Sequence, residues 1–401
     1  MSTSKSPRSK SPSAKSRSQH PLNSHSNPHP HWGAPPWHID FAVRTKPVPP
    51  SVDFAIVGGG FTGLAAAAWL RRLAPGKSVA VFEADRIGAG ASGRTGGMAL
   101  AESAAGDLPG LGNVLGGLER ILAELDIDCD LSLPGAFEIG RGKGLAHSPI
   151  QWSDSGTLRV MKKVPGGTLD PGKLVAGLAR VAGERGATIL EGRPVTQIEW
   201  QQRPHVHAVV HAGGSQCSAG KILFATNALA LELTALAEGA EPKLTLAVLT
   251  EPMDEKRLEA IGLAGGNPFY TVDLPYLWGR CRRDGSVIFG AGLVDADDSR
   301  DLRQLDITTG DAKNLFESIE LRIHNLHPEL REIAITHRWG GPILFRENWR
   351  PVFMPHPQSK NAIVLGAYAG HGVALSMYLG AWAAEALLGR RKLPSWGSIR
   401  K

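Results

Sequence analysis

The sequence predicts an α/β protein with a doubly wound, Rossmann-like domain and a discontinuous second domain, of α+β type, built on an antiparallel sheet. Three observations support this prediction. A strand, a glycine-rich turn and a helix follow one another in residues 51–98. A second glycine-rich helix start lies near the other end of the chain, in residues 361–389. Between them, residues 241–338 contain segments that alternate apolar and polar residues as half-buried strands do.

The first of these segments contains a nucleotide-binding motif. An apolar run, residues 54–57, leads directly into the sequence GGGFTG of residues 58–63, and a segment of helical composition follows. In a G-x-G-x-x-G motif Gly58 permits the tight turn, Gly60 lets the backbone approach a pyrophosphate, and Gly63 lets the helix pack against the strand. The phosphates then meet the unpaired N–H groups at the helix N-terminus. The motif therefore predicts a dinucleotide site.

A second strand and an acidic residue complete the motif. Pro75-Gly76 breaks the helix, and the apolar run of residues 79–82 ends at Glu83, which lies 20 residues after Gly63. A carboxylate in this place accepts hydrogen bonds from ribose hydroxyls. A glycine-rich turn alone is weak evidence in a chain with 48 glycines, whereas here the strand, helix and acid stand in register. The alternative for Glu83 is a solvated acid at a strand end.

The composition is that of an ordinary globular protein. The 401 residues are 42% hydrophobic and 20% charged, which suffices for a large core. No transmembrane segment is expected, because the longest uncharged apolar stretch, residues 361–384, is interrupted by glycines and by His371. Cys129, Cys217 and Cys281 are too far apart for a C-x-x-C pair or a disulfide framework, so a reducing, cytoplasmic compartment is expected.

The net charge of +6 belongs to the first residues of the chain. Residues 1–50 hold seven Lys and Arg and one acid, and the remaining residues hold 37 basic and 37 acidic side chains. Residues 1–31 have almost no large apolar side chain and are predicted to form a disordered basic tail. Residues 32–50 place Trp32, Trp37 and Phe41 among prolines, which predicts an extended strap over the body. Since the body is neutral, no specific nucleic-acid partner is predicted.

The middle of the chain is expected to pass twice into the second domain. Residues 101–125 have helical spacing, and residues 131–164 are interpreted as an irregular first visit. Asp170 as N-cap and Pro171 at the first helical position predict a helix that ends before Gly186. Strands are then expected at residues 187–190, 195–199, 205–211 and 221–226. His205, His207 and His211 alternate on one of them, and without carboxylates they predict no metal site.

Residues 241–338 are interpreted as the second visit. Strands are expected at residues 244–250, 276–281 and 286–290, with Asp284-Gly285 as a hairpin turn and a helix from about Thr309 to His327. A strand, a turn and a helix should follow at residues 362–365, 366–372 and 373–388. The expected domains are residues 51–130, 165–240 and 339–401 for the dinucleotide, and residues 131–164 and 241–338 for the substrate.

The loop of residues 86–98 carries a resemblance to a known family. Its sequence GASGRTGGM, residues 90–98, resembles the flavin-contacting loop of the FAD-dependent amine and amino-acid oxidoreductases, the family of D-amino-acid oxidase. The sequence GAYAGHGVA, residues 366–374, resembles the C-terminal flavin motif of that family. The likeness runs from about residue 52 to residue 389. It is closest to the gamma-glutamylputrescine oxidase type, whose members usually carry Asn in place of Thr95.

The resemblance implies an FAD cofactor and a set of residues that contact it. Val195 stands where the family places a backbone contact to adenine, and residues 225–227 match a turn of small residues. Relatives that bind flavin covalently use a Cys near residues 338–344, and this stretch has none, so the FAD is expected to be noncovalent. The expected cofactor residues are Gly58, Gly60, Phe61, Thr62, Gly63, Glu83, Ala84, Ala91, Ser92, Arg94, Gly97, Met98, Val195, Ala225, Thr226, Asn227, Gly370, His371, Gly372 and Val373.

The implied activity is oxidation of a C–N bond by transfer of a hydride equivalent from substrate carbon to flavin, with oxygen or another carrier as electron acceptor. The substrate class that the resemblance implies is an amine, such as a polyamine derivative, or an amino acid. An amine is expected rather than a small α-amino acid, unless Arg280 or Arg350 holds the carboxylate, because Ala374 stands where sarcosine oxidases hold it with Lys. The substrate pocket is predicted to include Tyr276, Trp278, Arg280, Trp339 and Arg350. Two alternatives are a pyridine-nucleotide dehydrogenase and a flavin-binding electron-transfer or partner subunit without a substrate of its own.

Overall fold

The computed structural model describes residues 31–203, 205–234, 236, 239–296 and 301–398. The predicted basic tail therefore lies outside the described residues, except for His31. No helix within these ranges combines the length and apolarity that a membrane crossing requires.

The first sheet of the described chain holds the dinucleotide motif. Its central strands are parallel, with β1 between β11 and β2, as a Rossmann-like fold requires. Its order is β17 (Val352–His356), β18 (Ser359–Gly366), β11 (Ser215–Phe224), β1 (Ser51–Val57), β2 (Val79–Phe82) and β8 (Thr188–Leu190), and the hairpin of β9 (Val195–Arg203) and β10 (Val206–Ala212) extends from β11.

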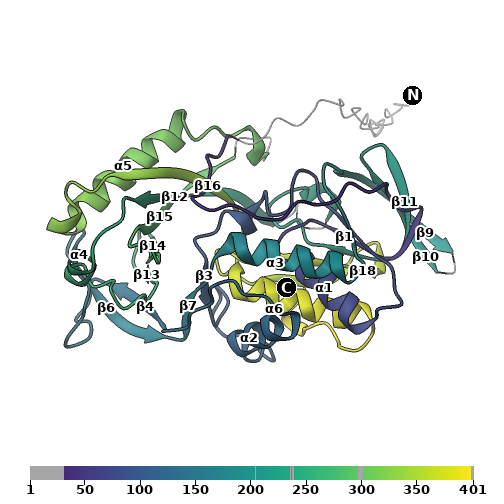
Figure 1. The fold of residues 1–401 in the computed structure, drawn as a ribbon, viewed down its shortest axis with the longest axis horizontal. Helices are drawn as coiled ribbons and strands as arrows, with labels where there is room; N and C mark the ends of the chain where they lie inside the picture. Colours follow the sequence, from purple (N-terminus) through teal and green to yellow (C-terminus); the bar gives the residue numbers. More distant parts are fainter. Residues whose placement is uncertain (1–30, 204, 235, 237–238, 297–300, 399–401) are drawn as a thin grey trace, which may run out of the picture.

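Four helices form a layer against this sheet (Figure 1). They are α1 (Phe61–Leu73), α2 (Val114–Leu125), α3 (Pro171–Glu184) and α6 (Gly372–Leu387). The layer forms because the helices are apolar: α1 buries every residue from Phe61 to Leu70, and α6 is buried from Val373 to Ala384. The predicted cap of α3 is confirmed, since the Asp170 side chain accepts a hydrogen bond from the Lys173 N–H and Pro171 begins the helix.

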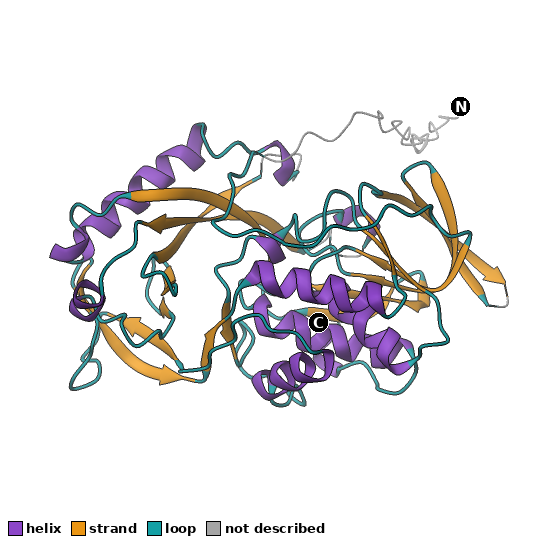
Figure 2. Ribbon diagram, viewed as in Figure 1, coloured by secondary structure: helices purple, strands orange, loops and turns teal. Residues whose placement is uncertain are grey.

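The second sheet arches away from the first (Figure 2). In the described residues its order is β16 (Ile335–Arg346), β12 (Ala240–Thr250), β15 (Val287–Asp295), β14 (Leu277–Cys281), β13 (Phe269–Thr271), β4 (Ala136–Gly140), β6 (Thr157–Val164) and β5 (Gln151–Ser153). All neighbouring pairs are antiparallel except β13 with β4. The predicted antiparallel second sheet is confirmed.

The remaining elements of the described residues are one small strand pair, two helices and five short 3₁₀ helices. Strands β3 (Met98–Leu100) and β7 (Gly166–Thr168) form a small antiparallel pair. Helices α4 (Glu255–Ala260) and α5 (Gly310–Leu326) accompany the second sheet, and the predicted helix near residues 309–327 is thereby confirmed. Short 3₁₀ helices span Ala91–Gly93 (η1), Leu231–Leu233 (η2), Leu302–Gln304 (η3), Pro328–Leu330 (η4) and Ser395–Gly397 (η5).

Two sequence-based interpretations were wrong. The helix expected over residues 101–125 begins only at Val114, because Gly106, Gly110 and Gly112 take positive φ angles and Asn113 provides the N-cap. Residues 131–164 are not irregular, since they contain β4, β5 and β6. Turn signals at both ends of this segment favoured the interpretation as irregular, although strands lie between them.

The predicted strap, residues 32–50, has no helix or strand and packs against the loop of residues 86–98. Trp32 and Trp37 are buried, and the Trp37 Nε1–H donates to the Gly93 carbonyl at 2.8 Å. The division of the chain into domains stays a prediction. The expected boundary at residue 339 falls within β16, which pairs with β12 from Ile335 to Arg346.

Candidate active site

A cavity of about 1650 Å³ lies at the C-terminal ends of β1 and β2 and is also lined by residues of the second sheet. Crevices at the carboxyl ends of parallel strands are the usual ligand sites of such folds. The volume exceeds the roughly 300–1,000 Å³ of ordinary small-molecule pockets, so it has room for a long cofactor together with a substrate.

The glycines of the motif leave no space for side chains. A Cβ on Gly63 would lie 2.0 Å from the Gly58 carbonyl oxygen, so helix α1 packs on β1 only without one. A Cβ on Gly60 would lie 2.7 Å from the Ser92 Oγ, and that same oxygen accepts a hydrogen bond from the Phe61 N–H at 2.8 Å. The helix N-terminus is therefore capped from the loop of residues 86–98 and faces the cavity with its backbone.

Glu83 lies at the end of β2 as predicted and is held by backbone donors. Its Oε2 accepts from the Gly59 N–H at 2.7 Å, and its Oε1 accepts from the Asp85 N–H at 3.0 Å. Burial raises the pKa of this carboxyl above its usual range, and the two backbone hydrogen bonds oppose that shift. The carboxyl lines the cavity, so the solvated alternative does not describe it.

Arg94 fixes the loop of residues 86–98 by donating to backbone carbonyls. Its Nε donates to the Ala89 oxygen at 3.0 Å, and its Nη1 donates to the oxygens of Gly33 and Gly340 at 2.8 and 3.2 Å. The Trp339 Nε1–H in turn donates to the Arg94 carbonyl at 2.8 Å. Arg94 thus joins the loop to the strap and to β16, while its side chain borders the cavity.

The second glycine-rich turn, residues 366–372, closes the cavity from the other side. Ala367, Ala369 and Gly370 take positive φ angles, which bends the chain sharply before α6. The Nδ1 of His371 and the Oγ1 of Thr226 are buried and have no hydrogen-bond partner among the described residues. Both residues line the cavity, so they offer polar atoms to a bound group.

These observations fit FAD. The cavity is large enough for this cofactor, and it is bordered by glycines that have no space for a Cβ. A helix N-terminus and two unpartnered polar atoms also face it. Of the expected cofactor residues, Gly63 and Gly97 serve packing and do not line the cavity; a Cβ on Gly97 would lie 2.2 Å from the Leu169 oxygen. Those that line it are Gly58, Gly60, Phe61, Thr62, Glu83, Ala84, Ala91, Ser92, Arg94, Met98, Val195, Ala225, Thr226, Asn227, Gly370, His371, Gly372 and Val373.

One row of residues crosses the second sheet above the cavity. Register pairs join neighbours in the order Glu138, Tyr270, Trp278, Gly290, Ala247 and Trp339. All of them except Gly290 line the cavity, and a Cβ on Gly290 would lie 2.0 Å from the Trp278 ring. The missing side chain lets this indole lie over β15. The wall therefore changes from aromatic at Trp339 and Trp278 to acidic at Glu138.

The acidic part of the wall was not predicted from the sequence. The Tyr270 hydroxyl donates to Glu138 Oε1 at 2.8 Å, and Glu102 also lines the cavity. Burial raises the pKa of Glu102, and the nearby carboxylates of Asp107 and Glu138 raise it further. The pairing of Glu138 with Tyr270 joins residues 132 positions apart, so no local pattern indicates it. The described residues contain no group of three His, Cys, Asp or Glu arranged as metal ligands.

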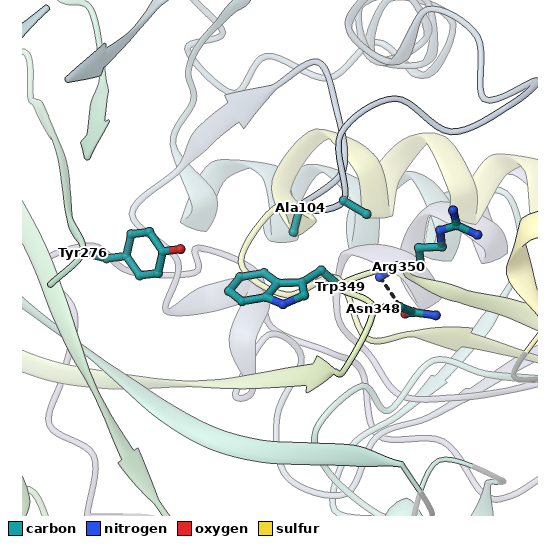
Figure 3. Close-up of a pocket in the computed structure, with 6 residues that line it drawn as sticks. Ala104, Tyr276, Asn348, Trp349 and Arg350 are labelled. Carbon is teal, nitrogen blue, oxygen red and sulfur yellow. Dashed lines mark hydrogen bonds between the residues drawn. The ribbon is translucent and has the colours of Figure 1, made fainter. Parts of the chain in front are cut away.

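The predicted pocket residues divide into two groups. Tyr276, Trp278 and Trp339 line the cavity, whereas Arg280 and Arg350 do not. Arg280 is buried behind the loop, where its Nε donates to the Gly96 carbonyl; burial lowers its pKa to about 10. Arg350 borders a smaller cavity of about 730 Å³ and points away from Tyr276 (Figure 3). Arg280 thus lies behind the wall of the large cavity, and Arg350 borders a smaller cavity that shares Ala104, Tyr276 and Trp349 with it.

A dinucleotide site that opens onto an aromatic and acidic cavity defines a nucleotide-dependent oxidoreductase. The chain belongs to the family of FAD dependent oxidoreductases, whose family model matches residues 53–386, and FAD is its cofactor. The pyridine-nucleotide alternative is not favoured by this match.

Two curated relatives and two solved structures illustrate the likeness. The chain is 28% identical over 388 residues to gamma-glutamylputrescine oxidoreductase of Escherichia coli (strain K12), covering 84% of each chain. It is 26% identical over 386 residues to the probable oxidoreductase OrdL of Rhizobium meliloti (strain 1021), covering 84% of this chain and 83% of the relative.

The structural likeness extends to proteins of lower identity. The glycine oxidase of Geobacillus kaustophilus superposes with a TM-score of 0.67 at 19% identity, covering 88% of this chain and 99% of that one. The L-proline dehydrogenase of P. horikoshii superposes with a TM-score of 0.67 at 17% identity, covering 86% and 95%. At these identities the superpositions show a shared fold.

Proposed function

We propose that the protein oxidises the C–N bond of a small-molecule amine, such as a polyamine derivative, and passes the electrons to oxygen or another carrier. The observation that carries the proposal is the charge of the cavity wall. Arg94, Arg303 and His371 are its basic residues among the described residues. An α-amino acid would bring a carboxylate, which is costly to bury without a cation.

None of these basic residues is a free cation. Arg94 donates to backbone carbonyls, and Arg303 donates to both carboxylate oxygens of Asp301 at 2.7 and 3.0 Å. Burial lowers the pKa of His371 and so favours its neutral ring. Ala374, in the position expected for a carboxylate-binding Lys, is buried in α6. Arg303 is thus paired with a carboxylate, and the Nε and Nη1 donors of Arg94 are engaged by carbonyl oxygens rather than directed at a substrate carboxylate.

The rest of the wall suits an amine. Trp278, Trp339 and Tyr276 present aromatic surface, which attracts cations as they enter and accommodates a neutral amine afterwards. Glu102 and Glu138 add negative charge. The relative from Escherichia coli is named for gamma-glutamylputrescine, a diamine acylated through the side chain of glutamate, and this supports an amine as the reacting group here.

FAD, when bound, accepts the hydride equivalent from the substrate carbon. The residues of the chain orient the cofactor and exclude water from it. Gly60 and Phe61 line the cavity at the positive end of α1, and Gly370 to Gly372 bring the positive end of α6 to the other side of the cavity. The second sheet covers the cavity with the row from Glu138 to Trp339. The bound amine must give up its proton before the transfer, because only the uncharged amine can lose hydride from its carbon.

Anaerobic bleaching of the flavin tests the proposal. Purified holoprotein is mixed with single compounds from a panel of diamines, N-acylated diamines and α-amino acids, and the absorbance of oxidised flavin is followed. Bleaching by an amine supports substrate oxidation. If dithionite bleaches the flavin and no compound of the panel does, the protein is instead an electron-transfer or partner subunit, and the proposal is wrong.

A further inference from the structure

The loop between β13 and β14, residues 272–276, forms one wall of the cavity opening and is here called the entrance loop. Val272, Leu274 and Tyr276 line the cavity although they are 50%, 70% and 44% exposed. Across the opening lies Trp349, which is 39% exposed and packs edge-to-face on Phe345 with ring centroids 5.4 Å apart. The rings of Tyr276 and Trp349 point toward each other (Figure 3).

Two arginines outside the cavity hold the backbone of the entrance loop. Arg141, directly after β4, donates from Nη1 to the Leu274 carbonyl at 3.3 Å, and its backbone N–H donates to Asp273 Oδ2 at 2.7 Å. Arg322, on α5, donates from Nη1 to the Tyr276 carbonyl at 3.2 Å. The carbonyl groups on either side of Pro275 are thus fixed by side chains from two other elements.

Both arginines converge on Asp154, in the turn between β5 and β6. Arg141 Nη2 lies 2.9 Å from Asp154 Oδ2, while Arg322 Nη2 and Nε lie 2.5 Å from Oδ2 and 3.2 Å from Oδ1. The three side chains are only 10% (Asp154), 14% (Arg322) and 23% (Arg141) exposed. Asp154 itself does not line the cavity. Its carboxylate is the shared acceptor that orients both planar guanidinium groups toward the loop.

We propose that Asp154 is a positioning residue for the substrate entrance: it holds Arg141 and Arg322, which fix the entrance loop and so place Tyr276 opposite Trp349. Without the carboxylate, the two guanidinium groups lose the negative charge that they share, while Arg141 keeps its contact with the backbone carbonyl of residue 154 at 2.7 Å. The guanidinium groups then separate and release the carbonyls of Leu274 and Tyr276. The entrance loop would open more often, and the wall that captures the substrate would be lost while the flavin site stays intact.

Hydrogen exchange tests the positioning without any substrate. In Asp154→Asn holoprotein, amide exchange in the peptide covering residues 272–277 should accelerate about tenfold or more, because local opening becomes more frequent. The control is Glu320→Gln. Glu320 lies on α5, as Arg322 does, and its Oε2 accepts from Arg338 Nη2 at 2.7 Å, so the variant removes a comparable acceptor away from the entrance loop. It should leave this peptide unchanged. Exchange that is unaltered in Asp154→Asn would overturn the proposal.

Steady-state kinetics test the consequence for substrate capture, and this arm alone depends on the proposed function. Asp154→Asn should raise the KM for an amine that bleaches the flavin by about tenfold, with kcat and flavin content within about twofold. In a Tyr276→Ala background, Asp154→Asn should raise the KM little further, because Asp154 acts through Tyr276. Additive effects, or a loss of kcat with unchanged KM, would contradict the proposal.

A more conservative variant covers the case in which Asp154→Asn does not fold. Arg322→Lys keeps the charge beside Asp154 and loses the fork that also reaches the Tyr276 carbonyl. It should give the same exchange pattern at residues 272–277 with a smaller amplitude. If no amine proves to be a substrate, the exchange results still decide whether Asp154 positions the loop, so the two failures are distinguishable.

Discussion

The hydroxyl oxygens of Thr62 and Tyr368 lie 2.8 Å apart in the core, although 306 residues separate them in the sequence. Thr62 stands in the first turn of α1, and Tyr368 stands in the turn before α6. Their hydrogen bond joins the two glycine-rich helix starts whose residues line the cavity. The relative placement of the two halves of the FAD site thus depends partly on one buried contact.

Tyr368→Phe should lower the free energy of unfolding by about 1–3 kcal/mol, because it leaves the buried Thr62 hydroxyl without a partner. The double variant Thr62→Val with Tyr368→Phe removes both polar groups and should recover most of this loss. Denaturant unfolding of the four proteins of the cycle measures the coupling. A loss in the double variant equal to the sum of the two single losses would show that the contact contributes nothing.

Gly60→Val should abolish FAD binding, because its side chain would enter the space between the α1 N-terminus and Ser92. Gly63→Val should also impair folding, since its Cβ would collide with the Gly58 carbonyl. Gly76→Ala is the matched control, because a Cβ at Gly76 meets nothing within 4 Å. The ratio of flavin to protein absorbance after purification checks all three. A Gly60→Val protein with full flavin content would refute the site.

FAD should be released by acid precipitation. The three cysteines of the chain are Cys129, Cys217 and Cys281, and none of them lines the cavity. Burial raises the pKa of the Cys217 and Cys281 thiols to about 11, which leaves little reactive thiolate at neutral pH. The yellow colour should therefore appear in the supernatant. Colour that remains with the pellet would indicate a covalent flavin.

Thermal stability should fall as the pH drops below about 6.5, the ordinary pKa of histidine. Burial lowers the pKa of His356 in the folded state, so the unfolded chain binds more protons in this range. The contribution of neutral His356 to stability is complete above the pKa of this residue in the unfolded chain. It is lost as the pH falls through the lower pKa of His356 in the folded protein. His356→Phe retains a ring beside Trp200 and Phe224 and cannot be protonated.

The comparison of melting temperatures at about pH 7.5 and about pH 5.5 checks the role of His356. The decrease should be smaller in His356→Phe than in the unaltered protein. The change in melting temperature between the two pH values isolates the effect of protonation. The variant also loses the hydrogen bond from the Gln358 N–H to His356, but this loss lowers the melting temperature at both pH values. An equal or larger decrease in the variant would contradict the assignment.

Local patterns predicted the cofactor half of the molecule well. The run from β1 through α1 to Glu83, the cap of α3 at Asp170 and the start of α6 each depend on residues close together in sequence. The resemblance of residues 90–98 and 366–374 to known flavin motifs added the cofactor. Glycine and proline positions carried most of this information, because they restrict the backbone directly.

The substrate half was predicted less well because it depends on pairing between distant strands. The parallel pairing of β13 with β4 brings Glu138 beside Tyr270, and the antiparallel pairing of β13 with β14 brings Tyr270 beside Trp278. Nothing in the neighbourhood of Glu138 indicates that partner. Arg280 lies two residues after the cavity-lining Trp278 on β14, but it is buried and its Nε donates to the Gly96 carbonyl, a contact between residues 184 positions apart.

The central claim is that the cavity accepts an amine and rejects a free α-amino acid. The most direct measurement is the anaerobic rate of flavin reduction by a polyamine and by its acylated derivative, compared with sarcosine, glycine and D-alanine at mildly alkaline pH. Because donors of Arg94 and Arg303 are engaged within the protein, the amines should reduce the flavin at least about tenfold faster, which corresponds to about 1.4 kcal/mol. Faster reduction by the amino acids would contradict the account.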